Sequence, residues 1–295
     1  MQARLRGIFP PIPTTFDESG SVDTHAIAAN VARWMATNLS GVLALGSNGE
    51  AVSLDEIESD QVLAAVRDEV PASKLLLAGT GRESTPATIA ACRRAGALGA
   101  DAVLVRPPSY YKAQMTADAL IGHYRRVADA SPVPVLLYNL PVTGVLLTYP
   151  VVAVLAEHKN IAGMKETSSE LERLGQFAAI DPEFRVLSGS ATVIYPALVS
   201  GAVGGILAVA NVLPAHCTAL FDHAKAGRQG EALAIQRAIM RLAQLVTSVH
   251  GIAGLKTALD LIGFHGGAPR LPLVPTPEPA REQIQHALAA FDRPA

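Results

Sequence analysis

Lys165 is the side chain with the clearest chemical potential in this sequence. It follows the short apolar run Ile161–Met164, and polar residues come directly after it. A short apolar run of this kind is typical of a buried strand that reaches a surface. A lysine there has its stem in the interior and an amine that could attack a carbonyl. The same pattern allows Lys165 to cap a strand or to pair with Glu166. Its position alone therefore does not show whether it is a structural residue or a nucleophile.

Other short apolar runs also end in residues that could act with such an amine. The glycine-rich segment Gly46–Glu50 follows one run, Arg106–Tyr111 follows another, and two more end at Tyr138 and at Ser188–Ser190. An amine attacks a carbonyl only when it is neutral, and burial disfavours the ammonium form. A phenol can carry the protons, and backbone N–H groups of a glycine-rich loop can hold a carboxylate. The set suits Schiff-base chemistry on a keto acid.

The histidines and cysteines favour no other mechanism. The eight histidines show no metal-ligand spacing such as His-Glu-x-x-His, and none stands at the end of an apolar run, where a Ser-His-Asp triad would need it. Cys92 and Cys217 form no disulfide framework and fall in helix-period segments, as buried structural thiols do. We therefore expect neither a metal ion nor another cofactor.

The composition argues against several classes of partner. Of the 295 residues 49% are apolar, which is ample for a large core, and the net charge of −2 comes with no basic run. Nucleic acid and anionic membranes are therefore not expected partners. No stretch approaches the ~20 apolar residues of a membrane span, and no long apolar core follows Met1 as in a signal peptide. We expect a soluble, cytoplasmic protein.

The candidate residues are positioned by an alternation of short apolar runs and longer segments of helical period. Most runs start about 25 to 35 residues apart, the length of one strand plus one helix. The eight predicted strands are Gly7–Pro10, Val42–Leu45, Leu75–Ala78, Ala102–Val105, Val135–Tyr138, Ile161–Met164, Arg185–Leu187 and Gly205–Ala208. Eight such units predict an α/β fold, a closed (β/α)8 TIM barrel. An open doubly wound sheet is disfavoured because Pro11 and Pro13, rather than a glycine-rich turn, follow the first run.

The alternation stops near Gly227. Beyond it, Glu231–Val249, Gly254–Ile262 and Ala280–Phe291 have helical period, and the proline-rich segment Pro269–Pro279 connects the last two. We predict a catalytic barrel over residues 1–226 and C-terminal helices over residues 227–295 that pack on it. The active site of such a barrel lies at the C-terminal ends of its strands, where all the candidates converge.

Four separated motifs give the chain a resemblance to a known family. They are Gly46–Glu50, Tyr138–Gly144, Met164–Glu166 and Gly201–Ile206, and the similarity extends over nearly the whole chain. In these residues the sequence resembles the class I pyruvate-dependent aldolases, which include dihydrodipicolinate synthase and N-acetylneuraminate lyase. Within that family it is most similar to the 4-hydroxy-2-oxoglutarate aldolase branch, in the Ser-Asn form of the first motif and in Gly254–Lys256.

The resemblance implies a role for each matching residue. Lys165 would form the Schiff base with pyruvate, and Tyr138 would be the acid–base group at the reacting oxygen. Ser47 and Tyr111 would complete a proton relay, with Tyr111 donated by a neighbouring subunit. Ser47 and Asn48 would hold the pyruvate carboxylate. The other pocket residues at matching positions would be Thr167, Gly189 and Ile206. Family members are usually homotetramers, built as dimers of tight dimers, and a shared tyrosine requires such an assembly.

Two features depart from the family pattern. Dihydrodipicolinate synthases usually carry an arginine shortly after the Tyr-Asn motif, where it binds the carboxylate of the aldehyde substrate. The segment Tyr138–Gly144 has no arginine and is one residue shorter, which argues against the lysine-biosynthetic reaction. Arg106 stands where a smaller residue is expected. It either stacks on Tyr110 at the surface or supplies the charge for a distal substrate carboxylate.

We therefore expect a lyase that cleaves a 4-hydroxy-2-oxo acid, or forms one by condensation. The products would be pyruvate and an aldehyde, as for 4-hydroxy-2-oxoglutarate or a 2-keto-3-deoxy sugar acid. The alternative within the same chemistry is dihydrodipicolinate synthase, which condenses pyruvate with aspartate semialdehyde. The alternative of another class is a non-catalytic barrel that binds a keto acid, and its affinity would survive replacement of Lys165 by alanine.

Overall fold

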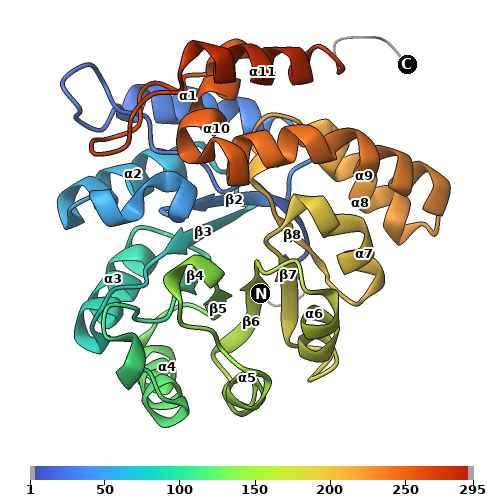
Figure 1. The fold of residues 1–295 in the computed structure, drawn as a ribbon. Coiled ribbons are helices and arrows are strands. Elements are labelled where there is room, and N and C mark those ends of the chain that lie inside the picture. Colours follow the sequence, from blue (N-terminus) through green and yellow to red (C-terminus); the bar gives the residue numbers. More distant parts are fainter. Residues whose placement is uncertain (1–3, 292–295) are drawn as a thin grey trace.

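Eight parallel strands surround the centre of the molecule and form a barrel (Figure 1). The computed structural model describes residues 4–291. The strands are β1 Gly7–Phe9, β2 Gly41–Ala44, β3 Leu75–Gly79, β4 Ala102–Val105, β5 Val135–Asn139, β6 Ile161–Glu166, β7 Arg185–Ser188 and β8 Gly204–Ile206. They pair in the order β1-β8-β7-β6-β5-β4-β3-β2, and a parallel bridge between Pro11 and Leu43 joins the two remaining edges. The predicted (β/α)8 barrel is confirmed.

The helices that follow the strands cover the outside of the barrel (Figure 1). They are α1 Thr24–Met35, α2 Glu56–Glu69, α3 Thr85–Ala97, α4 Ala117–Ala130, α5 Tyr149–Ala156, α6 Leu171–Ala178, α7 Ile194–Val199 and α8 Pro214–Lys225. Several begin at a residue whose side chain accepts a free backbone N–H of the first turn. In α2, for example, Asp55 and Glu58 form a capping box. The two cysteines lie buried in α3 and α8, as predicted.

The alternation of side chains along the strands divides the core into two layers. Side chains that point inward fill the barrel itself, and those that point outward pack beneath the helices. The inner layer includes Phe9, Leu43, Leu77, Leu104, Leu136, Tyr138, Leu187 and Ile206. The outer layer includes Val42, Leu76, Val103, Leu137, Met164 and Val186, with Trp34 and Phe177 from the helices. A packed interior leaves room for chemistry only at the ends of the strands.

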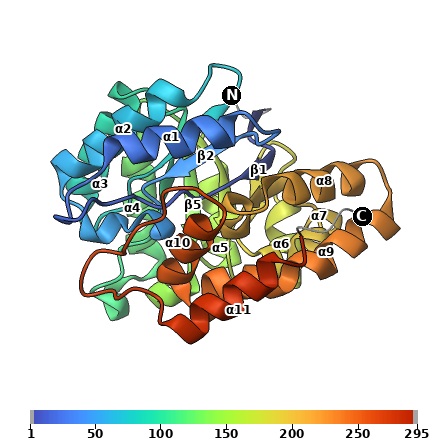
Figure 2. The same ribbon diagram turned by 90° about the horizontal axis from the view of Figure 1, so that it is seen from above.

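The chain after α8 forms three helices that pack on one another and on α8 at one side of the barrel (Figures 1 and 2). They are α9 Gln229–Gln244, α10 Gly251–Leu261 and α11 Glu278–Leu288. The helix predicted through Val249 stops being α-helical at Gln244 and continues as a π-helical turn. Trp34 of α1 stacks on Phe264 at 5.2 Å between ring centroids, which ties this region to the barrel. The division at residues 226 and 227 stays a prediction.

Among residues 4–291, no helix has the length and apolar character that crossing a membrane requires.

Candidate active site

Lys165 lies within a strand and points into the barrel. The prediction ended the strand at Met164, whereas β6 continues to Glu166. In the register with β5, Val135 pairs with Ile161 and the next residue pairs with Gly163, so that β6 carries one extra residue, a β-bulge. The bulge shifts the alternation by one position. Lys165 therefore pairs with the inward-facing Tyr138, and it would face the helices if the strand were regular.

Gly163 allows this bulge because the neighbouring strand passes very close to it. A Cβ atom at Gly163 would lie 2.0 Å from the carbonyl oxygen of Arg185 in β7. Real Cβ atoms do not approach backbone oxygen to that distance, so any side chain here would displace β7 or straighten β6. The glycine two residues before Lys165 is thus part of the reason why the amine faces inward.

The Lys165 amine lies against the Tyr138 phenol inside the barrel. Its Nζ donates to Tyr138 Oη at 3.2 Å and lies 4.5 Å from the centroid of the same ring. On the other side of the phenol, Ser47 Oγ is 3.5 Å from Tyr138 Oη. Lys165 and Tyr138 are both buried. An amine, a phenol and an aliphatic hydroxyl thus form a continuous chain along which a proton can pass.

Glu166 points the other way and is not the partner of Lys165. Its carboxylate accepts hydrogen bonds from Asn139 Nδ2 at 2.8 Å and from the Ser168 backbone N–H at 2.7 Å. The Arg173 guanidinium approaches it to 4.0 Å. The hypothesis that Lys165 pairs with Glu166 is therefore wrong for the described residues.

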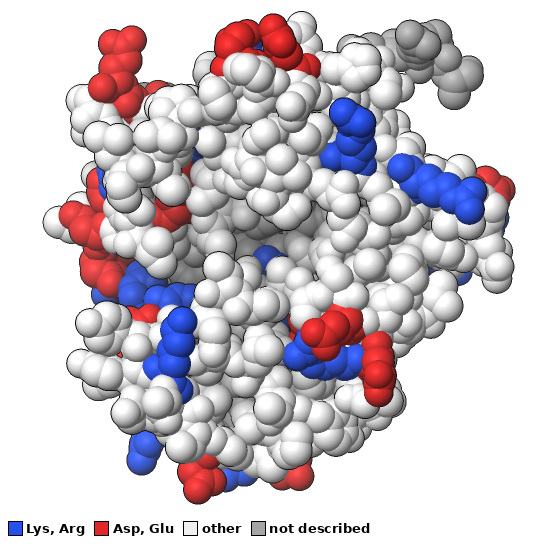
Figure 3. Space-filling model, in the orientation of Figure 1, with Lys and Arg blue, Asp and Glu red and all other residues white. Residues whose placement is uncertain are grey.

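A cavity of about 720 Å³ opens beside this chain of groups. Ser47 and Tyr138 line it, and the leucines Leu45, Leu104 and Leu140 add apolar walls. Figure 3 shows the hollow on the face of the molecule, with mostly uncharged atoms around it and cationic atoms at its floor. Lys165 Nζ lies 3.2 Å from the hydroxyl of Tyr138, which lines the cavity. The cavity therefore lies next to the pair formed by the phenol and the amine.

The segment Gly46–Glu50, named here the β2 loop, presents Ser47 and Asn48 at the end of β2. Ser47–Gly49 form a single turn of 3-10 helix, and the Thr14 hydroxyl donates to the Gly49 carbonyl at 2.7 Å. Ser47 is exposed to the cavity and Asn48 is half-buried. The structure therefore places Ser47 with Tyr138 and Lys165, and it places Asn48 next to them along the chain.

Thr167 and Gly189 pack against the lysine on its other side. A Cβ atom at Gly189 would lie 2.9 Å from Lys165 Cε and 2.3 Å from Thr167 Oγ1, so only glycine leaves space for both side chains. Thr167 Oγ1 is buried and has no hydrogen-bond partner among the described residues. A buried hydroxyl without a partner is costly, and a polar substrate group would satisfy it. Ile206 lies in the inner layer of the barrel.

Tyr111 is not brought to this site within one chain. It is 68% exposed and packs edge-to-face on Tyr110 with 5.0 Å between the ring centroids. Neither tyrosine lines the cavity. A catalytic Tyr111 would have to act in the cavity of a second subunit.

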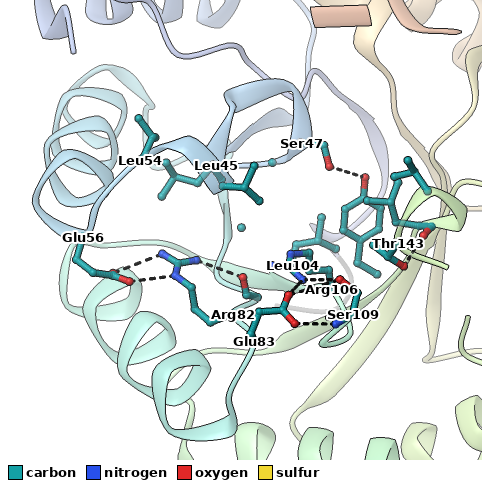
Figure 4. A pocket seen from close by; sticks show the side chains of 18 residues that line it. Leu45, Ser47, Leu54, Glu56, Arg82, Glu83, Leu104, Arg106, Ser109 and Thr143 are labelled. Atoms are coloured by element: carbon teal, nitrogen blue, oxygen red, sulfur yellow. Dashed lines mark hydrogen bonds and ion pairs between the residues drawn. The ribbon is translucent and has the colours of Figure 1, made fainter. Parts of the chain in front are cut away.

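Arg106 lines the outer part of the cavity but does not stack on Tyr110, which was one of the two hypotheses. Its Nη1 lies 2.7 Å from Glu83 Oε1, and the other Glu83 oxygen accepts the backbone N–H of Ser109 (Figure 4). The same oxygen also accepts the backbone N–H of Tyr110. Burial alone would raise the pKa of Glu83, but the N–H groups of Tyr110 and Ser109 and the Arg106 guanidinium outweigh it and lower that pKa. Glu83 thus holds Arg106 at the cavity wall as a carboxylate neighbour.

Sequence reasoning missed three charged residues of this outer part, Glu56, Arg82 and Glu83, which all line the cavity (Figure 4). Arg82 Nε lies 3.0 Å from Glu56 Oε1. A signal was present for Arg82 and Glu83, because both follow the third predicted strand as the other candidates follow theirs. Among residues 4–291, no three or more His, Cys, Asp or Glu side chains gather as a metal-binding group.

Comparison with known proteins agrees with this geometry. The model of the dihydrodipicolinate synthetase family matches residues 4–291. A protein of Emericella nidulans named probable 4-hydroxy-2-oxoglutarate aldolase, mitochondrial, is 37% identical over 292 residues, which cover 97% of this chain and 93% of that protein. A 4-hydroxy-tetrahydrodipicolinate synthase of Exiguobacterium sp. is 34% identical, with coverage of 97% and 98%.

Solved structures share both the fold and the extent of the chain. One is YagE, a prophage protein of the dihydrodipicolinic acid synthase family from E. coli K12, crystallised in complex with pyruvate. It superposes with a TM-score of 0.90 at 29% identity and covers 97% of this chain and 98% of its own. With the family model matched from residue 4 to residue 291, the chain belongs to the dihydrodipicolinate synthetase family.

Proposed function

We propose that the protein is a carbon–carbon lyase that cleaves a 4-hydroxy-2-oxo acid to pyruvate and an aldehyde through a Schiff base on Lys165. It is most like 4-hydroxy-2-oxoglutarate or 2-keto-3-deoxy sugar acid aldolases. The observation that carries the proposal is the 3.2 Å contact between Lys165 Nζ and Tyr138 Oη at the inner end of the cavity. An amine beside a proton-carrying phenol is what carbinolamine formation and dehydration require.

The reaction can be written with the groups present. The Lys165 amine attacks the C2 carbonyl, the carbinolamine oxygen is protonated, and water leaves to form the Schiff base. Loss of the C4 hydroxyl proton then breaks the C3–C4 bond. The aldehyde departs, and the bonding electrons move to the iminium nitrogen to give an enamine. Protonation of C3 and addition of water to the imine release pyruvate and restore the amine. We assign these proton transfers to Tyr138, whose hydroxyl lies 3.2 Å from the Lys165 amine and 3.5 Å from Ser47 Oγ.

The carboxylate next to the reacting carbonyl needs donors at the mouth of the barrel. Ser47 and Asn48 occupy that position on the β2 loop, and Ser47 is already 3.5 Å from the phenol. The unpartnered Thr167 hydroxyl supports a second polar contact close to Lys165. With these contacts the keto acid would be oriented for attack before the aldehyde part of the substrate is bound.

The walls on the far side of the cavity favour the aldolase over the synthase. The segment after Tyr138 contributes Leu140, Val142 and Thr143 to the cavity, and none of these can pair with a carboxylate ion. A carboxylate at the distal end of the substrate would instead meet the Arg106 guanidinium, which already forms an ion pair with Glu83. What favours the aldolase is that Tyr138–Gly144 lacks the arginine with which dihydrodipicolinate synthases usually bind the carboxylate of aspartate semialdehyde.

A second copy of the chain would complete the site. Tyr110 and Tyr111 pack on each other and are 78% and 68% exposed, and Val142 after β5 is 82% exposed. Exposed apolar groups that gather in this way mark an interface with another protein. In a symmetric dimer each subunit would offer Tyr111 to the Ser47 and Tyr138 of the other. The homotetramer, a dimer of such dimers, and the cytoplasmic location both stay predictions.

Reductive trapping tests the proposal. The protein is treated with pyruvate and borohydride, and the modified lysine is identified by intact mass and peptide mapping. A pyruvate-derived adduct on Lys165 is expected, with none in Lys165→Ala and an undiminished one in Lys112→Ala, where an exposed lysine is removed. An adduct on another lysine, or pyruvate affinity that survives Lys165→Ala without turnover, would contradict the mechanism. Screening aldol cleavage against condensation with aspartate semialdehyde then separates the two reactions.

A further inference from the structure

A buried ion pair connects the β2 loop to the C-terminal helices. Lys256 Nζ of α10 lies 2.7 Å from Glu50 Oε1, and both side chains are completely buried. Among the ion pairs of residues 4–291, it is the one in which neither partner has any exposed side chain. Removing two charges from water is expensive, so a pair of this kind is weak evidence for stability by itself. Its location, three residues after Ser47, suggests a role in the site.

Glu50 has little freedom in this arrangement. Its backbone is left-handed, with φ 53°, and its N–H closes the 3-10 turn by donating to the Ser47 carbonyl at 3.2 Å. Its second carboxylate oxygen accepts the backbone N–H of Arg270 at 2.8 Å. The carboxylate is thus held from two directions by residues more than 200 positions away in the sequence. A change in its position would be passed directly to the turn that carries Ser47 and Asn48.

The partners of Glu50 are themselves fixed. Lys256 donates to the Ala268 carbonyl at 2.9 Å and lies 4.5 Å from the centroid of the Phe16 ring. The Arg270 guanidinium covers the same ring at 4.3 Å and binds Glu58 of α2 with both terminal nitrogens. Burial lowers the pKa of Lys256, and the Glu50 carboxylate opposes that shift. Residues of the C-terminal segment therefore hold the Glu50 carboxylate of the β2 loop, and none of these groups lines the cavity.

We propose that Glu50 and Lys256 are positioning residues, which hold the β2 loop so that Ser47 and Asn48 bind the carboxylate of the keto acid. The C-terminal helices thereby become part of the substrate site although none of their side chains lines the cavity. The inference rests on the proposed Schiff-base function. It predicts that loss of the pair weakens binding of pyruvate much more than it slows reaction of the bound pyruvate with Lys165.

The test uses the full chain and measures borohydride trapping on Lys165 over a range of pyruvate concentrations. Glu50→Gln keeps the shape of the side chain and removes its charge. It is expected to raise the half-saturating pyruvate concentration about tenfold, because a loop displaced by a fraction of an ångström costs less than the ~100-fold typical of 1 Å. The maximal trapping rate should stay within about threefold of the wild-type rate.

Two further variants separate positioning from folding. Lys256→Met leaves the Glu50 carboxylate buried without its cation and should lower Tm strongly. The double variant Glu50→Gln with Lys256→Met leaves no unpaired charge, so Tm should recover while the half-saturating concentration stays high. Asp101→Asn is the matched control, because it weakens the ion pair with Arg67 far from the β2 loop. It should lower Tm without changing pyruvate saturation.

The outcomes also separate this inference from the function on which it rests. If the wild-type protein forms no adduct on Lys165, the Schiff-base function is wrong. If the wild-type adduct forms but folded Glu50→Gln and the double variant both saturate at the wild-type pyruvate concentration, the positioning role alone is wrong. A lower maximal rate with unchanged half-saturation in these variants would overturn it equally.

Discussion

The side chains of Asn139 and Glu166 are hydrogen-bonded at 2.8 Å on the outer face of the barrel wall, directly behind Tyr138 and Lys165. Asn139 also accepts the Leu147 N–H at 3.0 Å, and all of these groups are buried. Because neighbouring residues of a strand face opposite ways, this outer bond fixes the register in which the inner phenol and amine meet.

Replacement of Asn139 by leucine should therefore damage both the fold and the chemistry. The variant leaves the buried Glu166 carboxylate short of a donor, which should lower the free energy of unfolding by about 3 kcal/mol. It should also slow trapping of pyruvate on Lys165. Asn160→Leu is the control, since Asn160 bonds the carbonyls of Ala128 and Ser131 away from the site. Equal loss of trapping in both variants would indicate general destabilisation instead.

Gly189→Ala should remove activity while the protein stays folded. Its new methyl group would meet Lys165 Cε at 2.9 Å and Thr167 Oγ1 at 2.3 Å, so the lysine must leave its place beside the phenol. We expect trapping to fall by at least about 100-fold. Gly175→Ala in α6 is the matched control, because its nearest contact would be 3.7 Å and a helical alanine should add about 0.5–1 kcal/mol of stability. Wild-type trapping in Gly189→Ala would contradict the assigned packing.

The inward position of Lys165 shows what the sequence could and could not predict. The alternation of apolar runs and helical segments predicted the correct strand and the correct end of it for Lys165, because apolar runs and their spacing are local properties of the sequence. The extra residue in β6 is not local, since it exists only in the register against β5. From strict alternation, Lys165 and Tyr138 would not have been placed on the same face. The rule that strand ends meet at one end of the barrel brought the two residues together, and the family resemblance gave each of them its role.

The charged residues around the site were harder to predict for a related reason. The Glu50–Lys256 contact joins positions 206 residues apart, and sequence periodicity carries no information about such pairs. Arg106 was expected either at Tyr110 or at a substrate carboxylate, yet its neighbour is Glu83 from the preceding strand end. Side chains that follow adjacent strands of a barrel meet at one end, so Glu83 could have been proposed from the same rule that selected Arg106.

Acidification should destabilise the protein through His123, which is buried in α4. Burial lowers the pKa of His123 from 6.5 to about 4. In the unfolded chain His123 is protonated near pH 6.5, and in the folded chain only near pH 4. The contribution of neutral His123 to the free energy of unfolding is therefore fully present above pH 6.5 and decreases as the pH falls toward 4. At pH 5 the loss from this one group should be about 2 kcal/mol.

Denaturant unfolding of wild-type protein and His123→Gln at pH 7 and pH 5 measures this contribution. The variant should lose about 2 kcal/mol less than the wild type between the two pH values. His25→Gln, at an exposed histidine, should leave the wild-type difference unchanged. Parallel pH dependence in wild type and His123→Gln would show that another group is responsible.

Mixing two inactive variants should restore activity if Tyr111 acts in the neighbouring subunit. Tyr111→Phe lacks the shared hydroxyl, and Lys165→Ala lacks the nucleophile but still offers an intact Tyr111. A mixed dimer then contains one complete site, and random exchange of equal amounts should recover about one quarter of wild-type turnover. Turnover after co-refolding is the measurement. No recovery, despite mixed dimers detected by native mass spectrometry, would contradict a Tyr111 that acts in the site of the neighbouring subunit.

Arg106 and Glu83 offer a test of how the site recognises the distal end of its substrate. If the Arg106 guanidinium binds a second carboxylate, Arg106→Ala should raise KM for a dicarboxylic aldol such as 4-hydroxy-2-oxoglutarate by about 10- to 100-fold. The same substitution should change KM much less for a 2-keto-3-deoxy sugar acid, because the distal end of that substrate carries no charge. Glu83→Gln should act in the opposite direction, because it removes the carboxylate that now competes at 2.7 Å for Arg106. Unchanged KM for the dicarboxylic substrate in Arg106→Ala would mean that Arg106 and Glu83 only shape the cavity wall and that Arg106 does not bind the distal carboxylate.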